Sequence, residues 1–504
     1  MPKSPGGALL QGFTIERHSS VPIYRQLDAS LRRLILDGSL TPGQKLPSTR
    51  ELAQELGISR ITVKNVYEQI IAEGYAKAKT GAGTFVAEGL DTEAFPQIRT
   101  PRRKNRPSGI EISDRALTIA ASKSVARYGE TAPFRPGVPA LDQFPVKLWN
   151  KYLAEAMARD ARRGLSYGQV NGNAALREAI TRHLADARGM KVDAERVIIT
   201  SGAQQAFVLI AFVLLNQGDT VWYENPGHIA GRDVMQIMGA NVAPVPVDAE
   251  GLDLDQAIAR HPKPALIFTT PSHQQPLGTT MSLGRRLALL NYAQDNNAWI
   301  IEDDYDSEFR YRGRPLPALS ALDSGRRVFY VGTFSKSMFA AMRLGYVVVP
   351  SEYADTFATA RNLLGQNSSA VVEEAMAGFI EDGRFTEHIR KMRRLYRTRR
   401  DALFEALNQH CAQWLEPQRT DAGMHMVAWL KGGIDDQAAH QGLLDAGIDS
   451  LPISVYCIEP IGRAALVLGF SGVDERIIPR LVKRLADVLR TLAVAGHDEP
   501  GCTR

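Results

Sequence analysis

The sequence predicts two folded parts, a small winged helix-turn-helix at the N-terminus and a large α/β domain with a mainly parallel sheet. Helical apolar spacing, two capping serines and a glycine-tipped hairpin fill residues 1–87. A basic, proline-containing stretch interrupts the apolar periodicity over residues 88–133. From residue 134 to residue 495, short apolar runs alternate with helical patterns, which is typical of α/β units, and residues 496–504 form a tail.

The composition is that of an ordinary globular protein with an uneven distribution of positive charge. Of the 504 residues, 44% are hydrophobic and 23% are charged, which is enough for a small domain and a large one. Residues 1–110 carry sixteen Lys/Arg and ten Asp/Glu, whereas the rest of the chain carries forty-four and forty-five. The excess positive charge favours attraction of the N-terminal part to a phosphate backbone, although a solvated surface would explain it as well.

Cysteine spacing and hydropathy favour a soluble protein of the reducing cytoplasm. Cys411, Cys457 and Cys502 are too widely spaced for a disulfide framework or a metal site. No apolar run approaches the roughly 20 residues of a membrane span. The start of the chain, Met1–Gly7, lacks the apolar segment of a secretory signal. We therefore expect neither a metal nor a membrane partner.

The N-terminal domain is expected to hold three helices and a hairpin, with its core over residues 21–87. Apolar residues recur at helical spacing from Val21 to Leu36. Ser48 and Ser59 are placed to cap a short second helix and a longer third helix. Polar side chains gather at the start of the third helix, where a recognition helix meets base edges. The hairpin 75–86 has a glycine tip that can approach a phosphate closely.

The segments Leu46–Ala53, Leu56–Arg60 and Gly81–Val86 closely resemble the winged helix-turn-helix of the GntR family. The resemblance implies that double-stranded DNA is a partner. It also implies six DNA-contacting residues: Arg50, Ser59, Arg60, Thr62, Lys64 and Gly81. The alternative is a winged helix that makes only protein contacts.

The stretch 88–133 is predicted to be an extended, hydrated tether. Its basic residues lie among Pro96, Pro101 and Pro107, and they are Arg99, Arg102, Arg103, Lys104 and Arg106. Non-specific contact with DNA is an alternative role for them, but solubility and linker stiffness explain them equally well.

Five predicted strands of the large domain end in polar loops. The strands are Val197–Ile199, Val221–Tyr223, Leu266–Phe268, Trp299–Ile301 and Val328–Val331. Because ligands bind outside the carboxyl ends of strands in open α/β sheets, we expect these loops to converge on one pocket.

The loop after the last of these strands carries Lys336. A lysine that follows a strand and small hydroxyl residues suits Schiff-base chemistry with pyridoxal 5'-phosphate (PLP), because the amine must reach an aldehyde while the phosphate needs donors. The phosphate donors are expected to be Ser201, Gly202, Ala203, Thr333, Ser335 and Arg343.

The remaining loops offer partners for the cofactor ring. Asp303 can keep the pyridine nitrogen protonated, Tyr305 can hydrogen-bond the ring hydroxyl, and His228 can stack on the ring. Each has a plainer alternative, since a strand-end aspartate often caps a helix and a lone lysine is usually a solvated charge.

These motifs resemble fold-type-I aminotransferases, and more narrowly the MocR/GabR-type regulators that join a GntR-like winged helix to such a domain. The matching segments are Thr200–Gln205, Pro271–Gln274, Ile301–Phe309, Gly332–Lys336 and Arg343–Tyr346. The resemblance implies an internal aldimine at Lys336 and the ring and phosphate contacts given above. It further implies a homodimer in which Tyr167 reaches the phosphate of the neighbouring subunit and each winged helix packs across onto the partner.

Three positions bear on the ligand. His228 stands where the group generally has a stacking tyrosine, and protonation of the imidazole near neutral pH would add positive charge beside the cofactor. Gln275 stands where an aromatic residue is usual. Arg463, just before the predicted strand Ala465–Leu468, is the candidate for binding the carboxylate of an amino acid, and a surface arginine is the alternative.

The leading hypothesis for function is a transcription regulator that senses a small amino compound through aldimine exchange at Lys336 and thereby alters its binding to DNA. An active PLP-dependent aminotransferase that carries a DNA-binding domain is the alternative. A scaffold that uses no cofactor is the third possibility, and the intact set of Lys336, Asp303 and Tyr305 counts against it.

Overall fold

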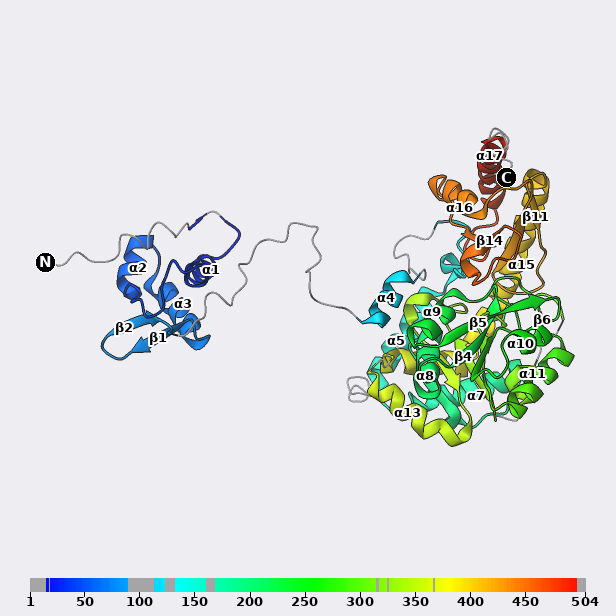
Figure 1. Ribbon diagram of the computed structural model, residues 1–504, viewed down its shortest axis with the longest axis horizontal. Helices are drawn as coiled ribbons and strands as arrows, with labels where there is room; N and C mark the ends of the chain where they lie inside the picture. Colours follow the sequence, from blue (N-terminus) through cyan, green and yellow to red (C-terminus); the bar gives the residue numbers. More distant parts are fainter. Residues whose placement is uncertain are drawn as a thin grey trace. The chain divides into compact units, whose positions relative to one another are not determined.

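In the computed structural model, the described residues are 15–17, 19–88, 113–122, 132–159, 168–313, 317–323, 326–365 and 368–495. The chain divides into two compact units, residues 1–111 and residues 112–504. Each unit is described by itself below, with the element labels of Figure 1.

The first unit is a winged helix-turn-helix, as the sequence predicts. It contains α1 (Ile23–Leu36), α2 (Thr49–Leu56), α3 (Arg60–Ala72) and the antiparallel pair β1 (Ala76–Lys79) and β2 (Gly83–Val86). Apolar side chains from all three helices fill one core, among them Leu27, Leu31, Leu52, Val63 and Ile70. Burial of this stripe leaves the polar start of α3 exposed.

The two predicted helix caps are confirmed. The Ser48 side chain accepts a hydrogen bond from the Glu51 amide, and the Glu51 carboxylate accepts one from the Ser48 amide, which makes a capping box. The Ser59 side chain accepts from the amide of Ile61 at the start of α3. Between them, Gly57 ends α2 in the left-handed region at φ 62°. Local sequence therefore fixes where both helices begin.

We expect Ser48→Ala to lower the local stability of α2 by about 1 kcal/mol, because the substitution leaves the Glu51 amide without its acceptor. Hydrogen exchange of the α2 amides in the full-length protein measures this loss. The matched control is Ser39→Ala, since Ser39 is exposed and lies outside the helix caps. Equal effects of the two substitutions would contradict the capping role.

The second unit is built on an eight-stranded sheet. Its order is β3 (Val197–Thr200), β10 (Gly345–Val348), β9 (Val328–Thr333), β8 (Trp299–Asp304), β7 (Leu266–Thr269), β4 (Thr220–Asn225), β5 (Asn241–Asp248) and β6 (Gly251–Leu252). The five strands from β9 to β5 in this order pair in parallel, while β10 runs antiparallel to both of its neighbours. The predicted mainly parallel sheet is confirmed, and so are all five predicted strands.

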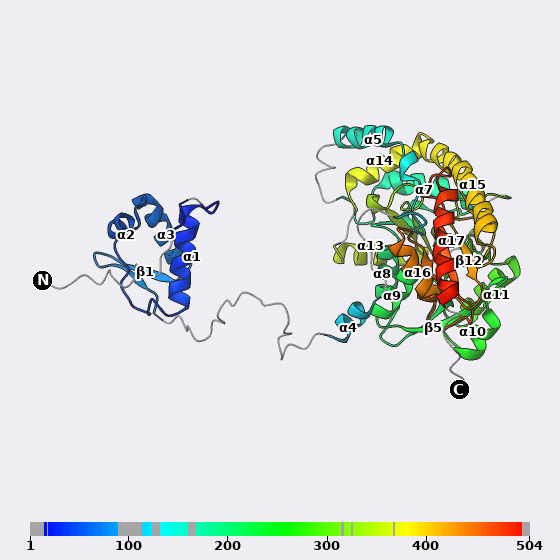
Figure 2. The ribbon, with the colours of Figure 1, turned by 90° about the horizontal axis from the view of Figure 1, so that it is seen from above.

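Helices cover both faces of this sheet (Figures 1 and 2). Side chains alternate between the two faces along a strand, as neighbouring residues of β3 show. Ile198 packs in the hydrophobic core on one face of the sheet, and Ile199 packs in the core on the opposite face. The face of Ile198 carries α8 (Ala203–Leu214), α9 (Ile229–Ile237) and α13 (Ala354–Leu363). The opposite face carries α5 (Val146–Arg159), α7 (Ala174–Arg188), α10 (Leu254–Arg260), α11 (Leu283–Asp295), α12 (Leu319–Leu322) and α14 (Ala370–Glu381).

A second, antiparallel sheet of four strands follows in the chain. Its order is β11 (Leu415–Pro417), β12 (His425–Leu430), β14 (Ala465–Gly469) and β13 (Leu451–Pro452). It packs with α15 (Arg384–Cys411), α16 (Asp436–Asp445) and α17 (Ile478–Ala495). The sequence predicted only β14 of these strands. The predicted C-terminal tail, residues 496–504, lies outside the described residues.

The predicted extended tether is wrong for one part of residues 88–133. Helix α4 (Asp114–Ala121) begins after Ser113, whose side chain accepts a hydrogen bond from the Ala116 amide. The helix packs on α9, and the Ser122 hydroxyl donates to Asp233 at 2.6 Å. Contact with α9 stabilises a helix too short to persist alone. The basic cluster between Arg99 and Arg106 lies outside the described residues.

Within the described ranges, no helix is long and apolar enough to span a bilayer. The same ranges contain no group of three or more His, Cys, Asp and Glu side chains arranged to hold a metal ion.

Candidate functional site

The loops at the ends of β3, β9 and β10 meet around Gly345. This glycine pairs with Thr200 of β3 on one side and with Thr333 of β9 on the other. A side chain at Gly345 could not fit, because its Cβ would lie 2.9 Å from the Cα of Gly202. The loop after Thr200 and the loop after Thr333 are therefore brought together, as the sequence predicts.

The residues expected to bind phosphate lie in these loops. Gly202 precedes α8 with φ 103°, so the first amides of the helix are available to an anion. The Ser335 amide donates to the Thr333 hydroxyl at 3.2 Å. Arg343 sits just before β10 and is exposed. Tyr167, expected at the phosphate of a neighbouring subunit, lies outside the described residues.

The Lys336 amine lies in the interior of the domain. Its Nζ donates to the carbonyl oxygen of Gly137 at 3.0 Å. Burial lowers the pKa of Lys336, although the nearby carboxylates of Asp306 and Asp303 oppose that shift. A lowered pKa makes the amine a better nucleophile at neutral pH. Gly137 has φ 76°, which favours glycine, and a Cβ there would lie 2.6 Å from Nζ, so another residue would displace the amine from this position.

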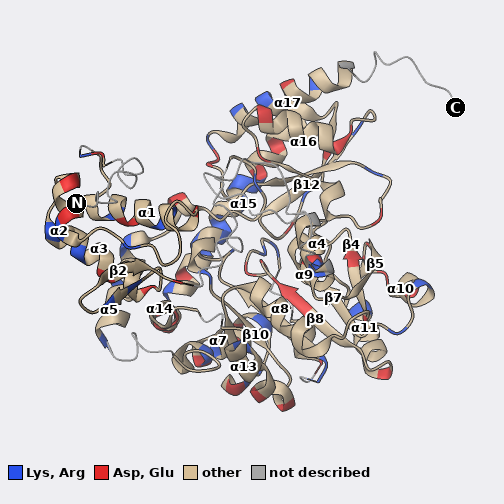
Figure 3. Ribbon diagram, turned by 60° about the vertical axis from the view of Figure 1, so that its left-hand side comes forward, with Lys and Arg blue, Asp and Glu red and all other residues tan. Residues whose placement is uncertain are grey.

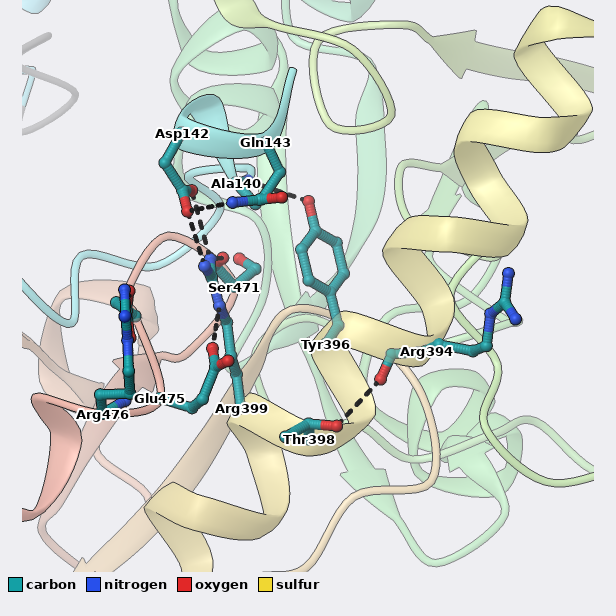
Figure 4. A network of polar contacts seen from close by, with 11 residues as sticks. Ala140, Asp142, Gln143, Arg394, Tyr396, Thr398, Arg399, Ser471, Glu475 and Arg476 are labelled. Carbon is teal, nitrogen blue, oxygen red and sulfur yellow. Dashed lines mark hydrogen bonds and ion pairs between the residues drawn. The ribbon is translucent and has the colours of Figure 1, made fainter. Parts of the chain in front are cut away.

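The segment that covers Lys336 is held by α15 (Figure 4). The Tyr396 hydroxyl accepts a hydrogen bond from the Ala140 amide at 3.0 Å. Arg399, only 1% exposed, donates to Asp142 at 2.8 Å and to the Ser471 carbonyl oxygen at 2.6 Å. These contacts fix the chain just after Gly137. Sequence reasoning missed this segment because its partners lie more than 200 residues away in the chain.

Arg135, on the same segment, is a further cation that the sequence analysis missed. Its guanidinium forms an ion pair with Asp449 at 3.2 Å, and its charge contributes to the lowered pKa of Lys336. Arg463, by contrast, stacks on Trp429 and pairs with Glu416 at the surface, with 49% of its side chain exposed. The structure therefore supports the alternative interpretation of Arg463 as a surface arginine.

Strand β8 ends in acidic residues near Lys336, and Figure 3 shows this end of the strand in red. Asp303 is 2% exposed, and among the described residues neither of its carboxylate oxygens accepts a hydrogen bond. Burial raises the pKa of Asp303 well above its usual range, and the charges of Asp304 and Asp306 add to the shift. A buried carboxylate without hydrogen bonds is costly, so a cationic partner at this position would relieve it.

His228 precedes α9 and faces the same carboxylate, with its Nδ1 3.4 Å from Asp303. Burial, with the positive charges of Lys336 and Arg232, lowers the pKa of His228 to about 3. A lowered pKa favours the neutral ring at neutral pH, so positive charge from His228 beside a cofactor is not expected there. A neutral imidazole can stack on a ring much as an aromatic residue does.

Tyr305 follows β8 and contacts a buried histidine. Its hydroxyl lies 3.1 Å from the Nδ1 of His273, which is also 3.1 Å from the Asp306 carboxylate. Burial raises the pKa of Tyr305 well above its usual range, so the phenol keeps its proton. The sequence analysis placed His273 at a strand end but assigned it no role.

The residues expected to contact DNA lie on the first unit. Arg50, Ser59, Arg60, Lys64 and Gly81 are exposed, and Thr62 is half-buried. The Arg60 Nε lies 3.4 Å from the Thr49 hydroxyl, so the starts of α2 and α3 are adjacent. Ile61, which the sequence analysis left out, is 69% exposed on the same turn and can contact a thymine methyl group. This surface has the polarity and shape of a recognition helix.

Three buried histidines make the fold sensitive to acid. Burial lowers the pKa to about 3 for His228 and to about 4 for His388 and His425, against a usual value of 6.5. Below about pH 6.5, the three imidazoles become protonated in the unfolded chain and stay neutral in the folded chain. Their contribution to the free energy of unfolding therefore falls as the pH drops from about 6.5 to about 4.

We expect each of these histidines to remove up to about 1.4 kcal/mol of stability per pH unit in that window. Urea unfolding of the cofactor-free protein at about pH 7 and about pH 5 measures the net change, to which buried carboxyl groups of raised pKa such as Glu302 contribute in the opposite sense, so the effect of one histidine is obtained by comparison with a variant. In His388→Asn the loss between the two pH values is expected to be smaller, because one of the three rings is gone. An equal loss in wild type and variant would contradict this account.

Comparison with known proteins agrees with this arrangement. The model of aminotransferase class I and II matches residues 137–485, and that of the bacterial regulatory proteins of the gntR family matches residues 23–86. Among solved structures, the α-aminoadipate aminotransferase LysN of Thermus thermophilus, complexed with N-(5'-phosphopyridoxyl)-L-leucine, is similar at TM-score 0.67 and 25% identity. The match covers 72% of this chain and 93% of LysN. The kynurenine aminotransferase of Pyrococcus horikoshii is similar at TM-score 0.66 and 27% identity, over 76% and 95% of the two chains.

Relatives with both parts are similar over nearly the whole chain. The probable rhizopine catabolism regulatory protein MocR of Rhizobium meliloti is 36% identical over 96% of this chain and 97% of its own. The pyridoxine biosynthesis transcriptional regulator PdxR of Corynebacterium glutamicum is 31% identical over 95% and 98%. The chain therefore belongs to the MocR-type transcriptional regulators, GntR-family proteins in which a winged helix-turn-helix is joined to an aminotransferase class I and II domain.

Proposed function

We propose that this regulator binds PLP through Lys336 and senses a small amino compound that displaces the lysine amine from the cofactor. The observation that carries the proposal is a buried lysine of lowered pKa near the buried carboxylate of Asp303, which accepts no hydrogen bond from the described residues. Burial of an ionisable group costs free energy, and a bound cofactor would offset this cost for both Lys336 and Asp303. The winged helix supplies the DNA-binding surface on which such a signal would act.

The pocket residues fit PLP. Asp303 would pair with the protonated pyridine nitrogen, which would give its buried carboxylate a charged hydrogen-bond donor. Tyr305 would donate to the ring hydroxyl, neutral His228 would lie against the ring, and the loops around Gly345 would hold the phosphate. When bound, PLP supplies an aldehyde that links covalently to amines and a ring that withdraws electrons.

Helix α4 offers a path from the pocket towards the linker. Its partner α9 begins at Ile229, directly after His228. Arg232, one turn further on, donates to the carbonyl oxygens of Val455 and Cys457. A shift of His228 on ligand exchange would thus move the helix on which α4 packs. We propose that this movement alters the arrangement of the winged helices on DNA, so that ligand and operator binding are coupled.

The proposal includes a homodimer. Large apolar side chains are exposed on the second unit, among them Leu141, Val146, Met157, Val170 and Leu363. Contact with a second chain would remove the apolar surface of those side chains that lie in the interface from water. Analytical ultracentrifugation of the full-length protein is expected to give the mass of a dimer, and a monomer at micromolar concentration would contradict this part of the proposal.

The test of the proposed function is the visible absorption spectrum of the purified protein during titration with a panel of amines and amino acids, with operator binding followed in parallel. We expect a yellow band that borohydride reduction fixes onto Lys336, and a spectral change with one class of amine that also changes operator affinity. A colourless protein that stays unchanged after addition of PLP would refute cofactor binding. A spectral change without any effect on DNA would refute sensing.

An active aminotransferase is the second candidate function, because Lys336, Asp303 and Tyr305 are all in place. The aromatic-amino-acid aminotransferase 1 of Thermococcus litoralis is 27% identical over 75% of this chain. Steady turnover of an amino donor with a keto acceptor, lost in Lys336→Ala, would favour this function. Spectral change with no turnover favours the regulator.

A further inference from the structure

His273 lies at the centre of a buried polar cluster beside the pocket. It is 3% exposed, and its Nδ1 is 3.1 Å from the Tyr305 hydroxyl and 3.1 Å from both carboxylate oxygens of Asp306. Its Nε2 lies 3.3 Å from the hydroxyl of Thr420, on the loop between β11 and β12. The imidazole therefore connects Tyr305, which is expected to contact the cofactor ring, with the β11–β12 loop of the four-stranded antiparallel sheet.

Two glycines lie close to this ring. A Cβ at Gly423 would lie 2.0 Å from the Cε1 of His273, and one at Gly278 would lie 3.1 Å from its Nε2. Both positions are glycine and both have positive φ, at 81° and 76°. The two glycines let the backbone approach the ring closely, and the contacts of Nδ1 with Tyr305 and Asp306 favour the orientation in which this nitrogen faces them.

The hydrogen bonds of this cluster determine which way the Tyr305 proton points. A carboxylate can only accept, so the Nδ1 of His273 must carry the hydrogen that it shares with Asp306. A nitrogen that carries a hydrogen cannot accept one from Tyr305. The single Nδ1 hydrogen can be shared between Asp306 and the Tyr305 oxygen as a bifurcated bond, so the Tyr305 oxygen is an acceptor on the His273 side and its own proton is free for a partner on the other side.

We propose that His273 is a positioning residue, which by donating from Nδ1 directs the hydroxyl proton of Tyr305 into the pocket. A phenol that accepts one hydrogen bond donates the next more strongly, so the imidazole also strengthens the bond that Tyr305 makes there. Without His273, the carboxylate of Asp306, which shares the Nδ1 of His273 with Tyr305 and whose charge acts on Tyr305, would compete for the phenol proton and draw it away from the pocket. The inference rests on the proposed function only for the identity of the group that receives this proton, the ring oxygen of PLP.

The first measurement needs no cofactor. Nitrogen-15 NMR of the cofactor-free protein, with His273 assigned by the variant His273→Asn, reports whether Nδ1 carries a hydrogen. We expect a protonated Nδ1 with a strongly deshielded proton, and we expect that proton to move upfield in Asp306→Asn. An unprotonated Nδ1 overturns the inference whether or not the protein binds PLP.

The second measurement is the pH midpoint of the visible band of the protein loaded with PLP. Loss of a donor to the ring oxygen should raise this midpoint, by about one pH unit in Tyr305→Phe. We expect His273→Phe to give a similar rise and His273→Asn, whose side-chain amide can donate in place of Nδ1, to stay close to wild type. In the double variant His273→Phe with Tyr305→Phe, the rise should equal that of Tyr305→Phe alone.

A purely structural role gives a different pattern. In that case His273→Phe would reduce cofactor content or stability without moving the midpoint, or would move it equally in the presence and absence of the Tyr305 hydroxyl. Either result overturns the inference. If wild type shows no visible band at all, the proposed function fails, and the NMR measurement on the cofactor-free protein still decides the role of His273.

Discussion

Replacement of Lys336 by alanine is expected to abolish both the covalent attachment of PLP and the response of operator binding to an amine. Lys336 carries the primary amine that donates to Gly137 in the covered site, and its buried environment lowers its pKa, so it is the group expected to bond to the aldehyde. After borohydride treatment, peptide mass spectrometry should find the cofactor on Lys336 in wild type and on no peptide of the variant. PLP can still be held without a covalent bond by the loops around Gly345.

The same variant should bind operator DNA in the absence of amine about as tightly as wild type, because the winged helix is a separate compact unit. The matched control is Lys483→Ala, which removes an exposed lysine of α17. The control should keep the yellow band and the amine response. An unchanged amine response in Lys336→Ala would sink the proposed covalent sensing, even if PLP remained bound.

Replacement of Arg60 by alanine is expected to weaken operator binding by about 1–3 kcal/mol, or roughly fivefold to 150-fold. Arg60 is the first residue of α3 and is exposed there, next to the start of α2. An arginine in this position can reach a guanine edge or a phosphate, and alanine can reach neither. Fluorescence anisotropy with a labelled operator at fixed salt measures the loss. Comparison with unrelated DNA separates a base contact, which relaxes sequence preference, from a phosphate contact, which does not.

Arg33→Ala is the matched control for this experiment, because Arg33 is exposed in the last turn of α1 and belongs to the same domain. Its effect on operator affinity should be much smaller than that of Arg60→Ala. The visible spectrum of Arg60→Ala should match that of wild type. Equal losses in the two variants would mean that net charge, and not the position of Arg60, controls the affinity.

Features set by neighbouring residues were predictable from the sequence. Ser48 and Glu51 are three positions apart, so the capping box that begins α2 is visible in the sequence itself. The apolar runs that become β8 and β9 are short, buried and followed by polar residues, which places Asp303 and Lys336 at strand ends. A local pattern can fix an element because its hydrogen bonds and its buried stripe lie within a few residues.

The tertiary structure decided what surrounds those residues. Gly137 meets Lys336 from 199 positions away, and Thr420 meets His273 from 147 positions away, so no local pattern could reveal either contact. The lowered pKa of His228, about 3, also depends on the fold, because burial and the nearby charges of Lys336 and Arg232 arise only when the chain folds. The sequence by itself determined the two domains, the strand ends and the residue types of the site. Only folding decided their protonation and their long-range partners, because desolvation and contact arise when distant segments pack together.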